Sequence, residues 1–312
     1  MGAQRVLQVA DKSIKGNSQW VATLTHDPSG SMIATGGWDK SIRIFDIESG
    51  KVVLKIRGTL FTGHHDRVYG LQYSKDGRLL LSASGDRTAR VWDVQAETCV
   101  KNMHGHTGDV KRTILSEDGN IIVSAARDKT IKLWDWRVQH HIRSLSDPKG
   151  WVEDIALSPD GRSLYSVGAS GCIKIWKDFS EARVETFTAH DQTITSIAVS
   201  PKGGMVATAS EDRSVRIWDA ATMVNTAVLK AHDNIVSSVA FNSDGSRLAS
   251  ASWDNSIEVW KTKSYNSVAT ILGHSDTVSC VEFSPTNDSL ASGSWDKNVK
   301  VWDLPRTSRS HR

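Results

Sequence analysis

The chain contains 312 residues, of which 23% are charged and 39% are hydrophobic, and its mean hydropathy is −0.33. This balance is typical of a globular chain and excludes a disordered one. The 38 basic residues exceed the 35 acidic residues by 3, which is too small an excess to indicate nucleic-acid binding without a concentrated basic patch.

Targeting and redox signals point to a reduced compartment. No apolar stretch approaches the roughly 18 residues of a membrane-spanning helix, and the first residues lack the apolar core of a secretion signal. The three cysteines, Cys99, Cys172 and Cys280, are odd in number and scattered, so no disulfide framework or zinc spacing is present. We therefore expect an intracellular protein, cytoplasmic or nuclear, that needs no metal and no cofactor.

A phrase of twelve residues recurs along the chain, which is the signature of a repeat architecture. In chain order the copies read TGGWDKSIRIFD, SASGDRTARVWD, SAARDKTIKLWD, SVGASGCIKIWK, TASEDRSVRIWD, SASWDNSIEVWK and SGSWDKNVKVWD. Their aromatic anchors are Phe45, Trp92, Trp134, Trp176, Trp218, Trp260 and Trp302. The first spacing between anchors is 47 residues and the following five are 42 residues each, so the repeats are structural units of nearly constant length.

Each repeat has the pattern of β structure. The segments that lead to the anchors alternate polar and apolar residues, as half-buried strands do. Turns that contain Gly separate the strands, because Gly supplies a positive φ and Asp caps the turn. They lie at residues 28–30, 75–77, 117–119, 159–161, 201–203 and 243–245, and the seventh, at residues 285–287, has Asn in place of Gly. We therefore predict four short strands per repeat and an all-β fold.

The period and the Trp-Asp phrases resemble the WD40-repeat family over essentially the whole chain. The resemblance implies a seven-bladed β-propeller, with four strands in each blade and a central channel. We expect a single domain over residues 1–304. Its blades would span about 16–58, 63–104, 105–146, 147–188, 189–230, 231–272 and 273–304, and residues 305–312 would form a disordered basic tail.

The last repeat stops one strand short of a blade, whereas the chain begins with spare residues that have strand character. Val6, Val9 and Ile14 lie in this segment. We infer that residues 5–14 supply the outer strand of the last blade. Such an overlap joins the two ends of the chain and leaves no unpaired edge between them.

A His, a Ser or Thr and an Asp recur at fixed distances before the Trp anchor. The complete sets are His64, Ser82, Asp86 and Trp92; His106, Ser124, Asp128 and Trp134; His190, Thr208, Asp212 and Trp218; His232, Ser250, Asp254 and Trp260; and His274, Ser292, Asp296 and Trp302. The family resemblance implies that each set is a buried hydrogen-bonded chain. The alternative is a hydrolase triad, but an active site need not occur five times, and no Gly-x-Ser-x-Gly turn exposes a nucleophile. We therefore expect no catalytic residue.

Two repeats depart from this pattern. The first has Asn17 in place of His and Phe45 in place of Trp, and the fourth has Asp147 and Pro148 in place of Gly-His and Ser170 in place of Asp. The network of blade 4 therefore cannot form as it does elsewhere. Either this blade is held more loosely, or its leading loop is free for a partner.

Six of the twelve tryptophans are anchors, and the other six require another explanation. Three of them, Trp38, Trp253 and Trp295, directly precede the Asp of a tight turn. Two more, Trp20 and Trp151, lie three residues after the Gly-His position. In the WD40 family both positions face the loops around the channel mouth, which is the usual recognition surface. The sixth, Trp136, is expected on the opposite rim.

The predicted binding surface has three sectors. An aromatic sector contains Trp20, Trp38, Trp253 and Trp295, flanked by Leu60, Phe61 and Tyr69. A basic sector contains Arg67, Lys111 and Arg127 with Asp109 between them. A mildly acidic sector contains Trp151, Glu153 and Glu211.

Large aromatic side chains surrounded by charge are typical of protein interfaces, and a Trp cluster can also hold an Arg or Lys side chain of a partner. We therefore interpret the chain as a non-catalytic scaffold of a multiprotein complex that recognises peptides or domains of other proteins on the loop face. Two alternatives stay open. The tryptophans can serve only to pack neighbouring blades, or the chain is a structural subunit of a ribonucleoprotein or ribosome-associated complex whose basic sector contacts phosphate.

Overall fold

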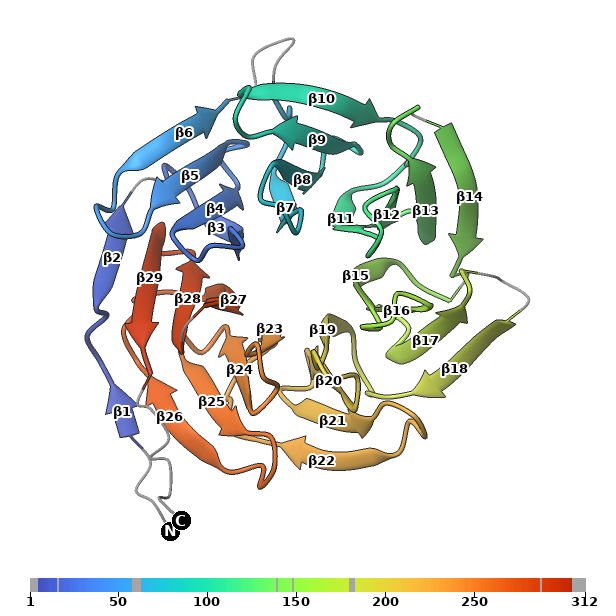
Figure 1. Ribbon diagram of the computed structural model, residues 1–312. Helices are drawn as coiled ribbons and strands as arrows, with labels where there is room; N and C mark the ends of the chain where they lie inside the picture. Colours follow the sequence, from blue (N-terminus) through green and yellow to red (C-terminus); the bar gives the residue numbers. More distant parts are fainter. Residues whose placement is uncertain are drawn as a thin grey trace.

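Seven sheets, antiparallel except for one added strand, are arranged radially around a central channel in the computed structural model (Figure 1). The structure describes residues 5–15, 17–57, 63–138, 140–147, 149–179, 183–286 and 288–304. Every labelled element is a strand, which confirms the predicted all-β, seven-bladed propeller. The expected tail at residues 305–312 and the flanking residues Leu60 and Phe61 lie outside the described residues.

Each sheet contains an inner strand beside the channel, a second strand, a third strand and an outer strand. The inner strands are β3 (Val21–His26), β7 (Val68–Tyr73), β11 (Val110–Leu115), β15 (Val152–Leu157), β19 (Ile194–Val199), β23 (Val236–Phe241) and β27 (Val278–Phe283). The second strands are β4 (Met32–Gly37), β8 (Leu79–Ser84), β12 (Ile121–Ala126), β16 (Ser163–Gly168), β20 (Met205–Ser210), β24 (Arg247–Ser252) and β28 (Ser289–Ser294). The third strands are β5 (Ile42–Asp46), β9 (Ala89–Asp93), β13 (Thr130–Asp135), β17 (Cys172–Lys177), β21 (Val215–Asp219), β25 (Ile257–Lys261) and β29 (Asn298–Asp303). The outer strands are β6 (Val52–Ile56), β10 (Thr98–Met103), β14 (His140–Ser146), β18 (Val184–Thr188), β22 (Asn225–Leu229), β26 (Ser267–Ile271) and β2 (Lys12–Lys15). We number the sheets as blades 1 to 7 in the order of their inner strands.

The beginning of the chain completes the last two blades (Figure 1). Strand β2 pairs antiparallel with β29, and its buried Ile14 lies opposite Val299, so an N-terminal strand closes blade 7 as predicted. A separate strand, β1 (Arg5–Leu7), pairs in parallel with β26 and gives blade 6 a fifth strand. The assignment of all of residues 5–14 to the last blade is therefore wrong for β1. Leu7 packs against the core between blades 6 and 7, which explains why this segment stays on the sixth blade.

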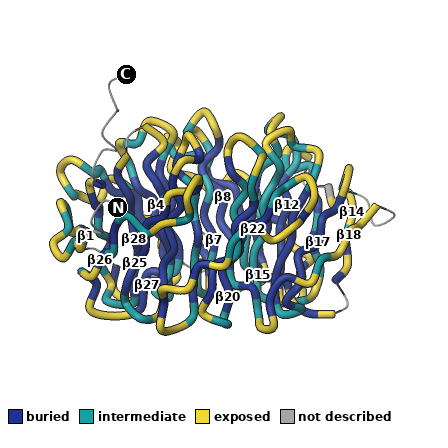
Figure 2. Tube along the Cα trace, turned by 90° about the horizontal axis from the view of Figure 1, so that it is seen from below, coloured by how far each residue is buried: buried dark blue, intermediate teal, exposed yellow. Residues whose placement is uncertain are grey.

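The hydrophobic core lies in the seams between blades. The anchor Trp92 of blade 2 shares a cluster with Ile42 and Ile44 of blade 1, and Trp302 of blade 7 packs in the same way on blade 6. Phe45 of blade 1 packs on blade 7. Each anchor therefore packs backwards onto the preceding blade, and burial of one such side chain stabilises the seam by about 1.5–3 kcal/mol or more. The centres of the strands are accordingly buried, whereas the turns on both rims are exposed (Figure 2).

The two faces of the ring carry turns between different pairs of strands. Hairpins between inner and second strands need a left-handed residue, and Gly77, with φ of 72°, supplies it in blade 2. On the other face, the turns between second and third strands also contain a left-handed residue, which in blade 4 is Gly171 with φ of 66°. We call this second face the loop face. It consists of these second-to-third-strand turns and of the connections that lead into the inner strands.

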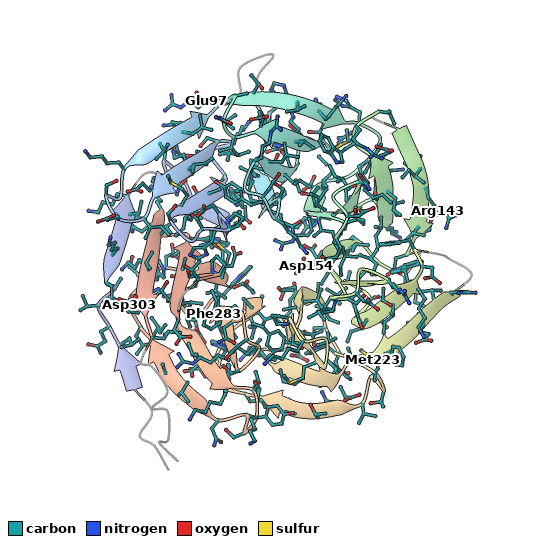
Figure 3. All side chains as sticks on the ribbon, viewed as in Figure 1. Glu97, Arg143, Asp154, Met223, Phe283 and Asp303 are labelled. Atoms are coloured by element: carbon teal, nitrogen blue, oxygen red, sulfur yellow. The ribbon has the colours of Figure 1, made fainter. Side chains whose placement is uncertain are left out.

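Polar side chains of the inner strands join neighbouring blades around the channel. Three hydroxyls donate to a backbone carbonyl of the next blade: Thr195 to Val236, Ser237 to Val278 and Ser279 to Val21. Arg112 Nε lies 3.6 Å from Asp154 Oδ1 on the next blade, and Figure 3 shows Asp154 at the edge of the central opening. The channel wall is therefore polar and holds ionisable groups.

Candidate functional site

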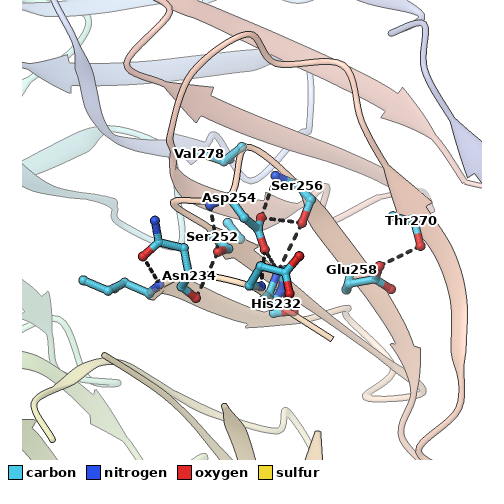
Figure 4. Close-up of polar contacts among 12 residues, drawn as sticks. His232, Asn234, Ser252, Asp254, Ser256, Glu258, Thr270 and Val278 are labelled. Atoms are coloured by element: carbon cyan, nitrogen blue, oxygen red, sulfur yellow. Dashed lines mark hydrogen bonds and ion pairs between the residues drawn. The ribbon is translucent and has the colours of Figure 1, made fainter. Parts of the chain in front are cut away.

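Five repeats contain the same buried hydrogen-bonded chain. In blade 6, Trp260 Nε1 donates to Ser250 Oγ at 3.1 Å, Ser250 Oγ lies 2.8 Å from His232 Nε2, and His232 Nδ1 lies 3.0 Å from Asp254 Oδ2. Figure 4 shows His232 beside Asp254 and Ser256. The corresponding distances in blades 2, 3, 5 and 7 lie between 2.6 and 3.0 Å.

These sets hold loops in place and do not present a nucleophile. The central hydroxyls are 0% exposed: Ser82, Ser124, Thr208, Ser250 and Ser292. Burial lowers the pKa of His64, although its hydrogen bond with Asp86 opposes the shift. Burial acts to raise the pKa of Asp86, but the hydrogen bonds from His64 and Thr88 outweigh it and hold that pKa well below its usual range. A neutral imidazole that donates to an ionised carboxylate is a stable pair at neutral pH.

Blade 1 replaces the histidine with an arginine. Arg43, two residues before Phe45, is only 2% exposed. Its Nη1 donates to Asn17 Oδ1 at 2.8 Å and lies 2.7 Å from Asp39 Oδ2. Burial acts to raise the pKa of Asp39, but hydrogen bonds, from Ser41 first and also from Arg43, lower it to about 2. The side chain of Phe45 has no N–H group, so it needs no hydrogen-bond partner in this set.

Blade 4 replaces the histidine with a lysine. Lys174 Nζ lies 2.7 Å from Asp147 Oδ1, and their side chains are 9% and 8% exposed. The anchor Trp176 still donates to Ser166 at 2.8 Å. A buried ion pair therefore fixes the leading loop of this blade. The sequence analysis did not foresee this pair, and the choice between a loosely held blade and a loop that serves a partner stays open.

Four spare tryptophans form one continuous group on the loop face, which we call the aromatic arc. The rings of Trp20 and Trp295 are stacked, with centroids 4.1 Å apart and planes at 2°. The ring of Trp38 lies 4.5 Å from that of Trp20, and the ring of Trp253 lies 5.3 Å from that of Trp295. The arc therefore joins blades 6, 7 and 1 in the order expected from the sequence.

Cations extend the aromatic arc onto blades 2 and 3. Arg67 Cζ lies 3.4 Å from the centroid of the Trp38 ring, and Arg67 Nη1 donates to the Tyr69 hydroxyl at 3.4 Å. Lys111 Nζ lies 3.9 Å from the centroid of the Tyr69 ring. Each such contact is worth about 0.5–2 kcal/mol. Ring and cation contacts thus run without a break from Trp253 to Lys111.

Glu153 neutralises two cations of the predicted basic sector. Its carboxylate lies 3.2 Å from Lys111 Nζ and 2.8 Å from Arg127 Nη2. Burial lowers the pKa of Lys111, and the charge of Glu153 opposes that shift. Separate basic and acidic sectors are therefore a wrong expectation, because inner strands β11 and β15 bring these side chains together. Asp109 contributes a backbone carbonyl that accepts from the Arg127 amide at 2.9 Å.

A cavity of about 320 Å³ opens at the mouth of the channel on the loop face. Its wall includes Trp151, Glu211 and Trp253, from blades 4, 5 and 6. The two tryptophans are 43% and 39% exposed, more than any other tryptophan of the chain. The carboxylate of Glu211 forms no ion pair with any residue that the structure describes.

The remaining spare tryptophan lies on the opposite face. Trp136 Nε1 donates at 3.0 Å to the carbonyl of Gly119, which belongs to a hairpin between an inner and a second strand. It follows the anchor Trp134 and takes no part in the aromatic arc. Five of the six spare rings therefore lie on the loop face.

The sequence analysis missed Arg43 and Lys174. Both stand two residues before an anchor, and both occur in the repeats that lack the histidine. The absence of His together with a cation at this position is the signal that could have identified them.

The described residues hold neither a metal cluster nor a membrane-spanning helix. Within the described ranges, no group of three or more His, Cys, Asp or Glu side chains could hold a metal ion. No helix among those same residues has the length and apolar character needed to cross a membrane.

A comparison with protein families decides the affiliation of the chain. The model for the WD domain, G-beta repeat, matches seven segments: 9–46, 55–93, 97–135, 139–177, 181–219, 223–261 and 265–303. The chain belongs to the WD40 family. Each matched segment after the first begins near the outer strand of one blade and ends in the third strand of the next. WD40 repeats and blades are thus offset by one strand, which is why β2 is needed to complete the ring.

Individual relatives match this WD40 chain over shorter segments than the family model does. WD repeat-containing protein 1 of Xenopus tropicalis is 36% identical over 88 residues, and guanine nucleotide-binding protein subunit beta-1 of Drosophila melanogaster is 32% identical over 93 residues. These stretches cover 28% and 30% of this chain and 14% and 27% of the two relatives. The similarity therefore spans about two repeats of each relative. WD40 propellers are typically non-catalytic scaffolds for protein interactions.

Proposed function

We propose that this WD40 propeller is a non-catalytic scaffold that recognises segments or domains of other proteins on its loop face, as a member of a multiprotein complex. The observation that carries the proposal is the unbroken series of rings and cations from Trp253 to Lys111 on that face. Among the relatives, the guanine nucleotide-binding protein beta proteins are named as subunits, which supports membership in a larger assembly.

The physical properties of the aromatic arc suit recognition. An indole ring offers a large contact area and loses few rotamers when a partner covers it. The stack of Trp20 on Trp295 and the guanidinium of Arg67 on Trp38 fix these rings before any partner arrives. A preorganised surface lowers the entropic cost of association. A partner segment that carries Arg or Lys fits the exposed indoles best.

Packing between blades does not account for all of the spare tryptophans. A ring that served only to fill a seam would be buried as the anchors are, and Trp92 is 1% exposed. Trp151 and Trp253 keep 43% and 39% of their surface in contact with solvent. Both lie at the channel mouth, where a partner segment can reach them.

The arrangement of the cations weighs against a ribonucleoprotein subunit. Phosphate binding draws its affinity from cations that release counterions, but Lys111 and Arg127 already share the carboxylate of Glu153. Arg67 is the remaining cation of the predicted basic sector, and its Cζ lies 3.4 Å from the centroid of the Trp38 ring. Within this sector, one cation without a carboxylate partner gives a weak attraction for a polyanion.

The test is to compare the proteins that co-purify with the wild-type chain and with the variant Trp253→Ala/Trp295→Ala. We expect the double variant to lose partners that the matched variant Trp136→Ala, which changes the opposite face, retains. Thermal unfolding of the variants checks that the ring stays folded. An unchanged set of partners in the folded double variant contradicts the proposal.

A second variant tests the nucleic-acid alternative. Arg67→Ala/Arg127→Ala removes two cations of the predicted basic sector and leaves the aromatic arc in place. We expect the protein partners to persist and their binding to depend weakly on salt. Loss of bound RNA in this variant, together with a steep fall of binding with salt, favours the ribonucleoprotein alternative instead.

A further inference from the structure

Glu211 occupies a special position on the loop face. It directly precedes the tight turn of blade 5, the position that Trp253 and Trp295 hold in blades 6 and 7 and Arg127 holds in blade 3. Its amide donates to the carbonyl of Thr193 at 3.0 Å, so its backbone is fixed. Its carboxylate has no cationic partner within the described part of the chain. A negative charge is thus held in place without a counter-charge.

The cavity that Glu211 lines contains exposed indoles beside cations and hydroxyls. Glu211 shares the wall of the cavity at the channel mouth with Trp151 of blade 4 and Trp253 of blade 6. These blades flank blade 5 on either side, and their two rings are the most exposed indoles of the chain. The other carboxylate on this rim of the cavity, that of Glu153, is already paired with Lys111 and Arg127.

We infer that Glu211, Trp151 and Trp253 form a subsite for the arginine or lysine side chain of a partner segment. The cationic head pairs with the Glu211 carboxylate, and the indole faces attract the same charge and cover its aliphatic stem. An apolar occupant would instead leave the carboxylate desolvated and unpaired, which is unfavourable. The inference rests on the proposed function, since it assigns a chemical preference to one part of the same face.

Other charges restrict where the basic side chain can lie. Further down the channel, the guanidinium of Arg112 repels a second cation, and Asp154, its neighbour at 3.6 Å, already accepts hydrogen bonds from Ser196 and the Ile197 amide. At the rim itself, Arg127 Cζ lies 5.7 Å from the centroid of the Trp151 ring, so this guanidinium and that of Arg67 across the mouth also repel a cation and leave the Glu211 and Trp253 side of the cavity most favourable. The basic side chain therefore binds at the rim on the side of blades 4 to 6 and does not pass down the channel.

The test measures binding of the capped tripeptide acetyl-Gly-Arg-Gly-amide by ligand-observed NMR titration. The matched probe contains citrulline, which has nearly the same shape as arginine and no charge. We expect the citrulline peptide to bind the wild-type propeller about tenfold more weakly than the arginine peptide, since a charge-assisted hydrogen bond is lost. The variant Glu211→Gln is expected to reduce arginine binding by a similar factor. The control Glu97→Gln makes the same chemical change on the outer circumference, where Figure 3 places Glu97, and should have no effect.

Three outcomes overturn the inference: no binding of the arginine peptide to the wild-type chain, equal binding of both peptides, or full binding by folded Glu211→Gln. Each of them leaves the proposed function standing, because that proposal is read from the partners lost by Trp253→Ala/Trp295→Ala. Conversely, unchanged partners of that double variant would reject the aromatic arc as the general recognition surface, whereas the peptide titrations with the wild type and Glu211→Gln would still report the charge preference of the cavity.

Discussion

Trp20, in the loop that leads into blade 1, stacks on Trp295, in the last tight turn of blade 7, with ring centroids 4.1 Å apart. The two residues belong to opposite ends of the chain. Their contact crosses the seam between blades 7 and 1, and β2, which completes blade 7 by pairing with β29, leads into Trp20. The stack therefore belongs both to the candidate recognition surface and to the seam where the ring closes, so a change that opens this seam also disrupts the aromatic arc.

A double-mutant cycle can measure the strength of this stack. We expect Trp20→Ala and Trp295→Ala each to lower the free energy of unfolding, and the coupling between them to be about 0.5–1.5 kcal/mol, as for other aromatic pairs. Urea denaturation of the wild type, the two single variants and the double variant gives the value. Strictly additive effects would show that the two rings do not stabilise each other.

Two truncations separate the roles of the N-terminal strands. Removal of residues 1–8 deletes β1, which only adds a fifth strand to blade 6, so we expect a small fall in the melting temperature. Removal of residues 1–15 also deletes β2, exposes the edge of β29 and takes the buried Ile14 from the core. We expect this chain to melt at a much lower temperature and to self-associate in size-exclusion chromatography. Similar melting temperatures of the two truncated chains would contradict the role assigned to β2.

The ion pair of blade 4 predicts a large effect of a single substitution. Lys174→Met leaves the buried carboxylate of Asp147 without its counter-charge and should cost about 3–5 kcal/mol. The double variant Lys174→Met/Asp147→Asn should recover a substantial part of this loss, because Asn removes the charge and keeps the oxygen that accepts from the Lys149 amide.

Chemical denaturation compares these variants with a matched exposed pair. Lys177 pairs with Glu185 on the surface, where both side chains are about half exposed. Lys177→Met should therefore cost less than about 1 kcal/mol. Equal losses for Lys174→Met and Lys177→Met would indicate that the blade 4 pair does not hold the loop.

The raised pKa of the buried Glu282 side chain predicts that the stability of the fold depends on pH. Burial raises its pKa to about 7, although the charge of Arg112 and a hydrogen bond from the His26 amide oppose the shift. Between pH 4.5 and about 7 the unfolded chain has lost this proton and the folded chain still holds it. Stability therefore falls as the pH rises through this window, by on the order of 1–3 kcal/mol.

The variant Glu282→Gln isolates this effect, since Gln stays neutral and can still accept the hydrogen bond from Thr25. We expect urea midpoints of the variant and the wild type to be similar at pH 5 and the variant to be more stable at pH 8. The control Glu97→Gln should follow the wild-type profile. Parallel profiles of Glu282→Gln and the wild type would contradict the raised pKa.

The fold and much of the candidate site could be predicted because the information is local. The 42-residue spacing of the anchors defines the repeats, and the resemblance to the WD40 family implies that Trp253 and Trp295, which precede a tight-turn Asp, lie on the loop face. The order of blades around the ring then brings Trp20 next to Trp295. None of these steps needs a side-chain conformation.

The errors concern contacts between neighbouring blades. Glu153 neutralises Lys111 because strands β11 and β15 lie side by side in neighbouring blades. The sequence of a single repeat does not determine how far one blade is shifted relative to the next, so this contact could not be predicted. Arg43 and Lys174 were missed because the position two residues before the anchor also holds Arg90, Lys132, Arg216 and Lys300 in other repeats. Arg90 and Arg216 also lie 3.5 and 3.9 Å from the Asp of their sets, although those sets keep the histidine, so a cation at this position does not by itself mark a repeat without histidine.

The backward packing of every anchor has a consequence for how the number of repeats is maintained. In an isolated repeat, the anchor indole would lack the preceding blade against which it packs. The repeat would therefore have no hydrophobic core. To insert or delete one 42-residue unit would change the angle at which each sheet meets the next, and this would strain all of the interfaces at once. The count of seven is therefore a property of the complete circle, and no single repeat can be gained or lost independently of the others.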